Sequence, residues 1–135
     1  MPTASESWRV VFRQGLVPVL SDKALAALRD GLANDDPALL QGQTTDPEPR
    51  SYVLDWPCYG GCAISFAGMR GEGLGTVGEV EEFFARACFE IDTRLGPASC
   101  RWFLNFWDET PRAEAVPVLL AEVELAIEKR KAVAS

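Results

Sequence analysis

The chain has 135 residues, of which 47% are apolar and 24% charged, a composition typical of one globular domain and not of a disordered or membrane-spanning protein. Its 20 acidic and 13 basic residues leave a formal net charge of −7, which disfavours binding to the phosphate backbone of nucleic acids or to an anionic membrane surface. The sequence contains no histidine, which excludes catalytic triads and dyads with an imidazole base, together with zinc sites that use histidine.

The N-terminal part of the sequence predicts a tail, a strand and a helix. Residues 1–6 are polar, without a basic region or an apolar stretch, so we expect a loose tail and no signal peptide before one globular domain over residues 7–135. Residues 8–12 are rich in strand-forming side chains and are predicted to be the first strand. Ser21 is the expected N-cap of a helix over residues 22–33.

Extended and irregular structure is predicted for the middle of the chain. Residues 41–50 form the longest irregular stretch, and long loops in compact domains are often where binding happens. Residues 52–56 and 62–67 are predicted strands, and the glycines within residues 68–75 indicate a flexible turn. These glycines do not form a phosphate-binding P-loop, because the lysine followed by serine or threonine of that motif is missing.

The second half of the sequence has two strong helix patterns on either side of a dense apolar run. Thr76 and Glu79 match a capping box, and the apolar residues that follow share one face, which predicts a helix over residues 77–95. Pro111 begins a last helix over residues 111–131, which Pro117 either kinks or restarts. Residues 100–107 between these helices fit either a strand buried on both faces or a helix, and we favour the strand.

Taken in order, these elements predict an α+β fold. The expected architecture is a small sheet of three or four strands, with the helices over residues 77–95 and 111–131 packed on it and a shorter helix over residues 22–33. No linker divides the sequence, and no internal repeat is visible in it.

The four cysteines are predicted to be core side chains and not a metal or redox site. A four-thiolate zinc site typically uses two close pairs of cysteines, whereas only Cys58 and Cys62 are close in the sequence, and Cys88 lies on the apolar stripe of the 77–95 helix. Three residues separate Cys58 from Cys62, and the usual redox dithiol has two. We therefore expect no metal and no cofactor; if a metal were bound, its ligands would be Cys58, Cys62, Cys88 and Cys100.

Aromatic side chains are concentrated in residues 100–107. Core packing is the first interpretation of this run. In the second, a strand with aromatic side chains on both faces leaves one face exposed, which points to another protein or to self-association. Polar residues beside the run would then form the rim of the contact. The candidate interaction residues are Trp102, Phe103, Phe106, Trp107, Asp108, Glu109 and Arg112.

No catalytic constellation is recognisable, and the sequence does not assign a function. We expect a cytoplasmic, non-enzymatic protein-interaction or regulatory module, such as an inhibitor or immunity-like protein whose acidic face covers a basic site, or an accessory subunit. The alternative is an enzyme, or a small-ligand or zinc-binding domain, that uses the loops of residues 41–75. Its polar groups would be Cys58, Cys62, Arg70 and Glu72. Binding to nucleic acid or to membranes is not expected.

Overall fold

The computed structural model describes residues 4–134, and this part of the chain is mostly helical. Within these residues the six α-helices are α1 (Ala4–Val11), α2 (Asp22–Ala33), α3 (Ala63–Gly71), α4 (Val77–Leu95), α5 (Cys100–Glu109) and α6 (Arg112–Ala134). A π-helical turn, η1 (Phe12–Leu16), and a 3₁₀ turn, η2 (Val17–Val19), continue directly from α1, and a second 3₁₀ turn, η3 (Ser51–Val53), lies in a long loop.

The predicted α+β fold with a sheet of three or four strands is wrong. In the described part of the chain, the strands are the two-residue β1 (Thr45–Asp46) and β2 (Gly60–Gly61), which pair antiparallel. They close the base of the loop over residues 47–59 and form no layer of the core. Residues 52–56, predicted as a strand, belong to η3 and the turn after it.

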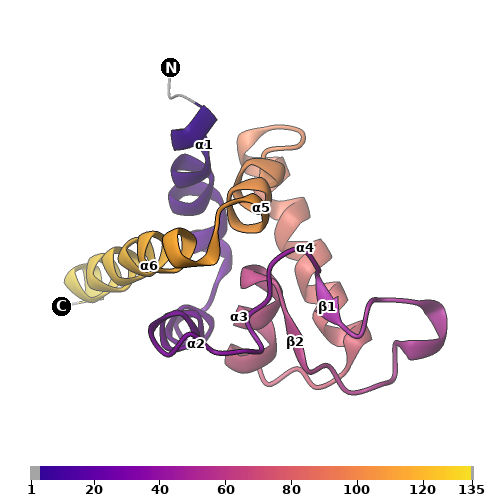
Figure 1. Ribbon diagram of the computed structural model, residues 1–135. Helices are drawn as coiled ribbons and strands as arrows, with labels where there is room; N and C mark the ends of the chain where they lie inside the picture. Colours follow the sequence, from indigo (N-terminus) through magenta and orange to yellow (C-terminus); the bar gives the residue numbers. More distant parts are fainter. Residues whose placement is uncertain (1–3, 135) are drawn as a thin grey trace.

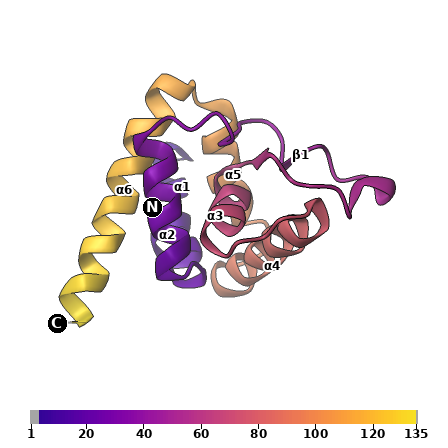
Figure 2. The ribbon, with the colours of Figure 1, turned by 90° about the horizontal axis from the view of Figure 1, so that it is seen from below.

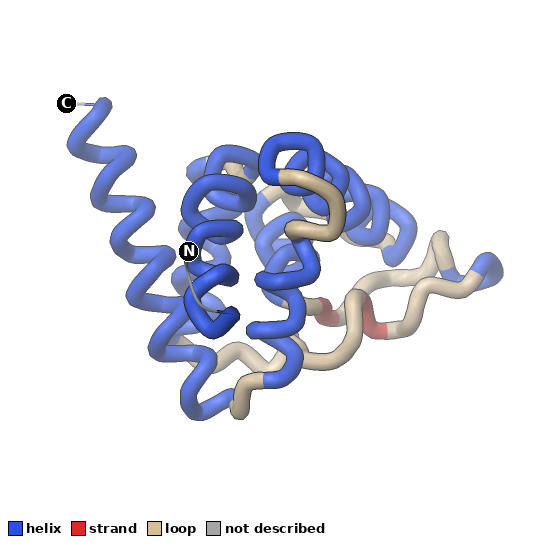
Figure 3. Tube along the Cα trace, turned by 90° about the horizontal axis from the view of Figure 1, so that it is seen from above, coloured by secondary structure: helices blue, strands red, loops and turns tan. Residues whose placement is uncertain are grey.

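The helices are arranged around α3. Figures 1 and 2 show α3 in the middle of the molecule, with α2 on one side and α4 on the other, and α1 packs against α5. α6 runs along the outside of α2, and its C-terminal turns extend beyond the other helices (Figure 3). The loop of residues 47–59 projects from the opposite side of the molecule (Figure 1).

Residues 8–12, predicted as a strand, are the end of α1 and the start of η1. Trp8, Val11, Phe12 and Leu16 are all buried, and their spacing of three and four residues matches one helical face. Five residues are too few to distinguish the helical period from the alternation of a strand. The helix α1 begins at Ala4, within the residues that were expected to form a tail. Residues 1–3 of that expected tail lie outside the described residues.

Residues 62–67 were also predicted as a strand. In the structure Cys62 is the N-cap of α3, and residues 63–67 form the start of this helix. Every residue from Ala63 to Met69 is buried, so the sequence shows no apolar stripe from which a helical period could be read. Two glycines allow the close packing around α3. A Cβ added to Gly31 of α2 would lie 2.4 Å from the ring of Phe66, and one added to Gly68 would lie 2.4 Å from the ring of Phe83.

Residues 100–107 form most of α5, so the helical alternative is correct and the favoured strand is wrong. Phe103 and Trp107, four residues apart, are fully buried, as expected for one face of a helix. The predicted helices over residues 22–33, 77–95 and 111–131 are all present, with Arg112 and Ala134 as the bounds of the last, and the helix is unbroken at Pro117. The capping box of Thr76 and Glu79 is confirmed.

Within residues 4–134, no helix combines the length and the apolar composition needed to cross a lipid bilayer.

Replacing Gly31 with alanine is expected to lower the free energy of unfolding by about 1–2 kcal/mol, because the new methyl group overlaps the ring of the fully buried Phe66. The loss exceeds the gain in helix propensity, which is at most about 1 kcal/mol. Gly75→Ala is the matched control, since no atom lies within 4 Å of its added Cβ. Urea denaturation measures both variants, and a Gly31→Ala protein as stable as the Gly75→Ala protein would refute the packing described.

Candidate functional site

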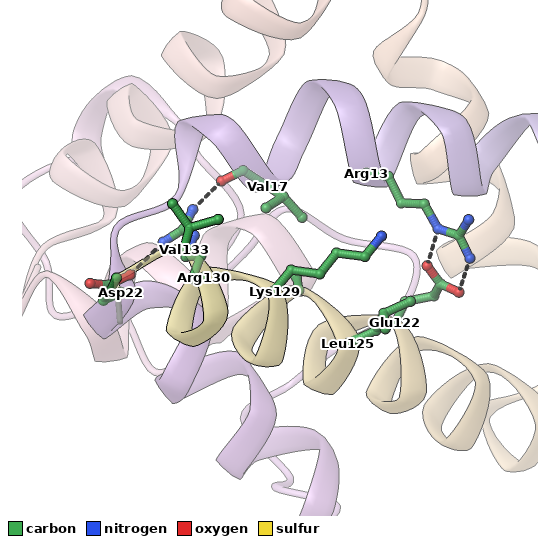
Figure 4. Close-up of a pocket in the computed structure, with 10 residues that line it drawn as sticks. Arg13, Val17, Asp22, Glu122, Leu125, Lys129, Arg130 and Val133 are labelled. Atoms are coloured by element: carbon green, nitrogen blue, oxygen red, sulfur yellow. Dashed lines mark hydrogen bonds and ion pairs between the residues drawn. The ribbon is translucent and has the colours of Figure 1, made fainter.

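The largest groove described lies between the C-terminal half of α6 and the segment that joins α1 to α2. It has a volume of about 490 Å³, within the range of ligand sites in proteins. Figure 4 shows Arg13 and Glu122 at one end, Asp22 and Arg130 at the other, and the side chain of Lys129 between them. The lining residues are Arg13, Val17, Asp22, Glu122, Leu125, Ala126, Lys129, Arg130, Val133 and Ala134. We call it the α6 groove.

A buried carboxylate closes one end of the α6 groove. Glu122 is 6% exposed, and it lies on the apolar stripe of α6 with Leu119 and Ala126. Arg13 donates to it from Nε at 2.7 Å and from Nη2 at 2.8 Å, and Arg9 donates from Nη1 at 3.0 Å. Two guanidinium groups thus pair with one carboxylate and hold the middle of α6 against α1 and η1.

The same contacts set the protonation of this end of the groove. The hydrogen bonds from Arg13, aided by the charges of both arginines, hold the pKa of Glu122 below its ordinary value in spite of its burial. Glu122 in turn raises the pKa of Arg13. The carboxylate is therefore ionised and bound at neutral pH.

Arg130 anchors the other end. Its Nη2 donates to the carbonyl oxygens of Val17 at 2.5 Å and Leu20 at 2.7 Å, and its Nη1 forms an ion pair with Asp22 at 2.8 Å. Val17 begins η2 and Leu20 is the residue after it, and the Val17 carbonyl also accepts a hydrogen bond from the Leu20 N–H at 3.1 Å. One side chain therefore fixes the C-terminal part of α6 to the turn between η2 and α2.

The ammonium group of Lys129 lies between the two anchors, and the apolar side chains of Leu125 and Val133 lie one helical turn before and after it on α6. Leu125 is 41% exposed and Val133 is 89% exposed, so much of the apolar wall faces solvent. The side chain of Lys129 extends along the groove toward Arg13 in Figure 4, and within residues 4–134 it has no hydrogen bond or ion pair. The groove lining thus carries three cations, Arg13, Lys129 and Arg130, against the two carboxylates of Asp22 and Glu122. This local surplus of positive charge contrasts with the net charge of −7.

The aromatic residues predicted as an interaction site lie mostly in the core. Phe103 and Trp107 are fully buried, and the indole nitrogen of Trp107 donates to the Leu40 carbonyl at 2.7 Å. Phe106 stacks on Trp8 with ring centroids 3.7 Å apart. Trp102 is 47% exposed. These side chains join α5 to α1 and to the loop after α2.

The polar residues predicted as the rim of that interaction site contact the loop that follows α2. The carboxylate of Asp108 accepts a hydrogen bond from the Gly42 N–H at 2.9 Å. Arg112 donates to the carbonyls of Leu39 and Asp36 and forms an ion pair with Asp35. Glu109 is exposed at the end of α5.

Three exposed aromatic side chains lie on the loop of residues 47–59, whereas the exposed Phe89 and Trp102 lie on α4 and α5. Tyr52 is 69% exposed, Trp56 51% and Tyr59 67%, and the rings of Tyr52 and Trp56 meet edge to face at 6.2 Å between centroids. Leu54 adds a fourth exposed apolar side chain to what we call the aromatic loop. Tyrosine and tryptophan are frequent in interaction hot spots, which makes this loop a second candidate surface.

The polar groups proposed for the loops of residues 41–75 are not assembled into one site. Cys58 donates to the Gly60 carbonyl and Cys62 to the Ser65 hydroxyl. Burial raises the pKa of both thiols, that of Cys62 to about 11. Arg70 pairs with Asp36, and Glu72 accepts a hydrogen bond from Ser21. No group of three or more potential metal ligands is found among the described residues.

The residues of the α6 groove were not predicted from the sequence. The chain has many charged residues, and nothing local distinguishes Arg13, Glu122 and Arg130 from the others. Their partners lie more than 100 positions away in the sequence. One signal was available: Glu122 interrupts the apolar stripe of the last helix, and a carboxylate on a buried face needs a charged or hydrogen-bonding partner.

Comparisons with known proteins give no relative on which to base a function. Neither the family models, nor the curated proteins, nor the solved structures contain a match to this chain. The chemistry of the α6 groove is therefore the basis for the function proposed below.

Replacing Glu122 with glutamine is expected to lower the free energy of unfolding by about 1–3 kcal/mol at pH 7, the range for hydrogen bonds to charged groups. The pKa of Glu122 is depressed in the folded state. The stabilisation is therefore present above the ordinary carboxyl pKa and is lost as the pH falls through the lowered pKa. Urea denaturation at several pH values should show the difference between the variant and the natural protein shrinking as the pH falls below the ordinary glutamate pKa of about 4.3.

The control for this prediction is Glu124→Gln, which removes an exposed carboxylate from the same helix. We expect it to change stability by less than about 0.5 kcal/mol. Equal losses in the two variants, or a Glu122 effect that does not vary with pH, would contradict the buried ionic contact.

Proposed function

We propose that the protein is a protein-interaction module that binds an acidic amphipathic helix of a partner protein in the α6 groove. The observation that carries this proposal is an apolar trough with an unpaired lysine, bounded at both ends by side chains that already have partners. The proposal keeps the class of function expected from the sequence and moves the contact from the aromatic run to α6.

The dimensions of the groove suit a short helix. The wall formed by α6 extends from Glu122 to Ala134, about 18 Å at a rise of 1.5 Å per residue. This length matches about three turns of a partner helix, whose apolar side chains at i, i+4 and i+7 would contact Val17, Leu125 and Val133. Burying these exposed side chains is the main source of affinity.

The charge of the groove supports an acidic partner. Lys129 lies between the two anchors, and no carboxylate of residues 4–134 pairs with it; an aspartate or glutamate on the partner would supply one. Such a contact at a rim contributes more to specificity and association rate than to affinity. A basic partner would instead face the surplus positive charge of the groove and be rejected.

A protein helix fits the groove better than a fatty acid does. Val133 is 89% exposed and Leu125 41%, so the trough is open along its side. An alkyl chain laid there would stay largely in contact with water, whereas sites for small ligands bury most of the ligand surface. A helix covers the open side with its own backbone and polar face.

Selection from a displayed library of helical peptides on the immobilised protein tests the proposal. We expect the selected peptides to carry three apolar residues on one face together with aspartate or glutamate, and Lys129→Glu or Val133→Asp to weaken their binding at least about tenfold. Both changes are at exposed positions and should leave the fold intact.

Lys23→Glu is the matched control, because it makes the same charge change at an exposed position of α2 outside the groove. Trp56→Ala is the control for the aromatic loop, because it removes an exposed aromatic side chain there. The proposal fails if the selected peptides bind the Lys129→Glu and natural proteins equally, or if Trp56→Ala abolishes binding. It also fails if a long-chain fatty acid binds in the groove and no peptide does.

A further inference from the structure

The sulfur atoms of Cys88 and Cys100 lie 2.9 Å apart. Cys88 lies on α4 and is partly exposed, while Cys100 is the first residue of α5 and is buried. Both are free thiols, so two reducing groups from different helices are in direct contact. The sequence places them 12 positions apart, and α4 and α5 are joined by a turn at residues 96–99.

We propose that Cys88 and Cys100 are a redox-active dithiol, which a peroxide oxidises to an intramolecular disulfide between α4 and α5. This site is independent of the α6 groove. Forming the bond requires the two sulfurs to approach from 2.9 Å to about 2.05 Å, a movement of less than about 1 Å. The fold already holds the two side chains where the bond would form.

The turn between the helices fixes the position of Cys100. Gly96 ends α4 with a φ of 113°, a conformation that favours glycine. The carboxylate of Asp92 accepts a hydrogen bond from the Cys100 N–H at 2.9 Å, and the Ser99 hydroxyl donates to the Gly96 carbonyl at 2.6 Å. Asp92 thus ties the first turn of α5 to α4 one helical turn after Cys88.

The two thiols have different roles because their surroundings differ. A hydrogen bond from the Cys100 thiol lowers the pKa of Cys88, and this effect outweighs the burial and the carboxylates of Asp92 and Glu81, which act to raise it. The pKa of Cys100 is raised, first by its contact with Cys88 and then by burial. Cys88 is the partly exposed thiol and Cys100 is buried, so Cys88 attacks the oxidant as the nucleophilic thiolate and Cys100 resolves the product.

The reaction is balanced with hydrogen peroxide as the oxidant. The Cys88 thiolate attacks one peroxide oxygen, the O–O bond breaks, and hydroxide leaves and takes up a proton to form water. The sulfenic acid left on Cys88 is attacked by the sulfur of Cys100, whose proton is released as the S–O bond breaks and a second water leaves. In total, two thiols and one peroxide give one disulfide and two waters.

Cys58 and Cys62 serve as the internal comparison. They are the close pair in the sequence, yet each thiol donates to a different acceptor, and burial raises the pKa of both. The closest cysteines in the sequence are therefore the unreactive pair, and the distant ones are the reactive pair.

The experiment is peroxide titration of the reduced full chain, followed by tryptic mapping without reduction. Cleavage after Arg86, Arg94 and Arg101 places Cys88 and Cys100 in the separate peptides 87–94 and 95–101, whereas Cys58 and Cys62 share the peptide 51–70. We expect peptides 87–94 and 95–101 to become linked, with an intact mass lower by about 2 Da. The disulfide should also raise the midpoint of thermal unfolding by several degrees.

Variants assign the roles. In Cys100→Ser, Cys88 should accumulate as a sulfenic acid that dimedone traps, and in Cys88→Ser, the buried Cys100 should stay reduced. A Cys58→Ser/Cys62→Ser double variant should form the linked peptides at the natural rate, and circular dichroism checks that each variant is folded. A disulfide within peptide 51–70, links between chains only, or oxidation of Cys88 no faster than that of Cys58 would overturn the proposal.

Discussion

Two ionic contacts near the ends of one helix segment determine the shape of the candidate site. Glu122 is held by Arg13 and Arg9, and Arg130 by two carbonyls and Asp22. The first contact satisfies a carboxylate that would be costly to bury alone, and the second joins α6 to the turn before α2 by an exposed ion pair and two hydrogen bonds to carbonyls. Between these two points, α6 buries Val123 and Ala126 and leaves Leu125 and Lys129 exposed along the groove.

The sequence was informative where a helix is buried on one face and capped. The 22–33 and 77–95 helices have polar outer faces and Ser21 or Thr76 as N-caps, and their bounds were predicted correctly. The predicted sheet was wrong because three apolar segments are too short or too completely buried to show a period. α3 is buried on every side, so its residues resemble those of a central strand, which is also buried on both faces.

The candidate site was less predictable than the fold because its contacts join distant parts of the chain. Arg13 and Glu122 are 109 positions apart, and no local pattern pairs one arginine with one glutamate. The thiol pair shows the same limit: the sequence predicted all four cysteines as core side chains, whereas the turn held by Asp92 brings Cys88 to Cys100. Local patterns predict elements, and charge pairing across elements depends on the packing that those elements adopt.

The aromatic run of α5 is connected to the α6 groove through a chain of contacts. Phe106 stacks on Trp8 of α1, and the guanidinium of Arg9 lies 4.7 Å from the centroid of the Trp8 ring, a distance at which cation–π attraction operates. The same guanidinium donates to Glu122 of α6. The stack therefore positions Arg9 at the closed end of the groove. Aromatic residues in a small domain can thus support binding indirectly, because they position the arginine that holds a separate helix, here α6, in place.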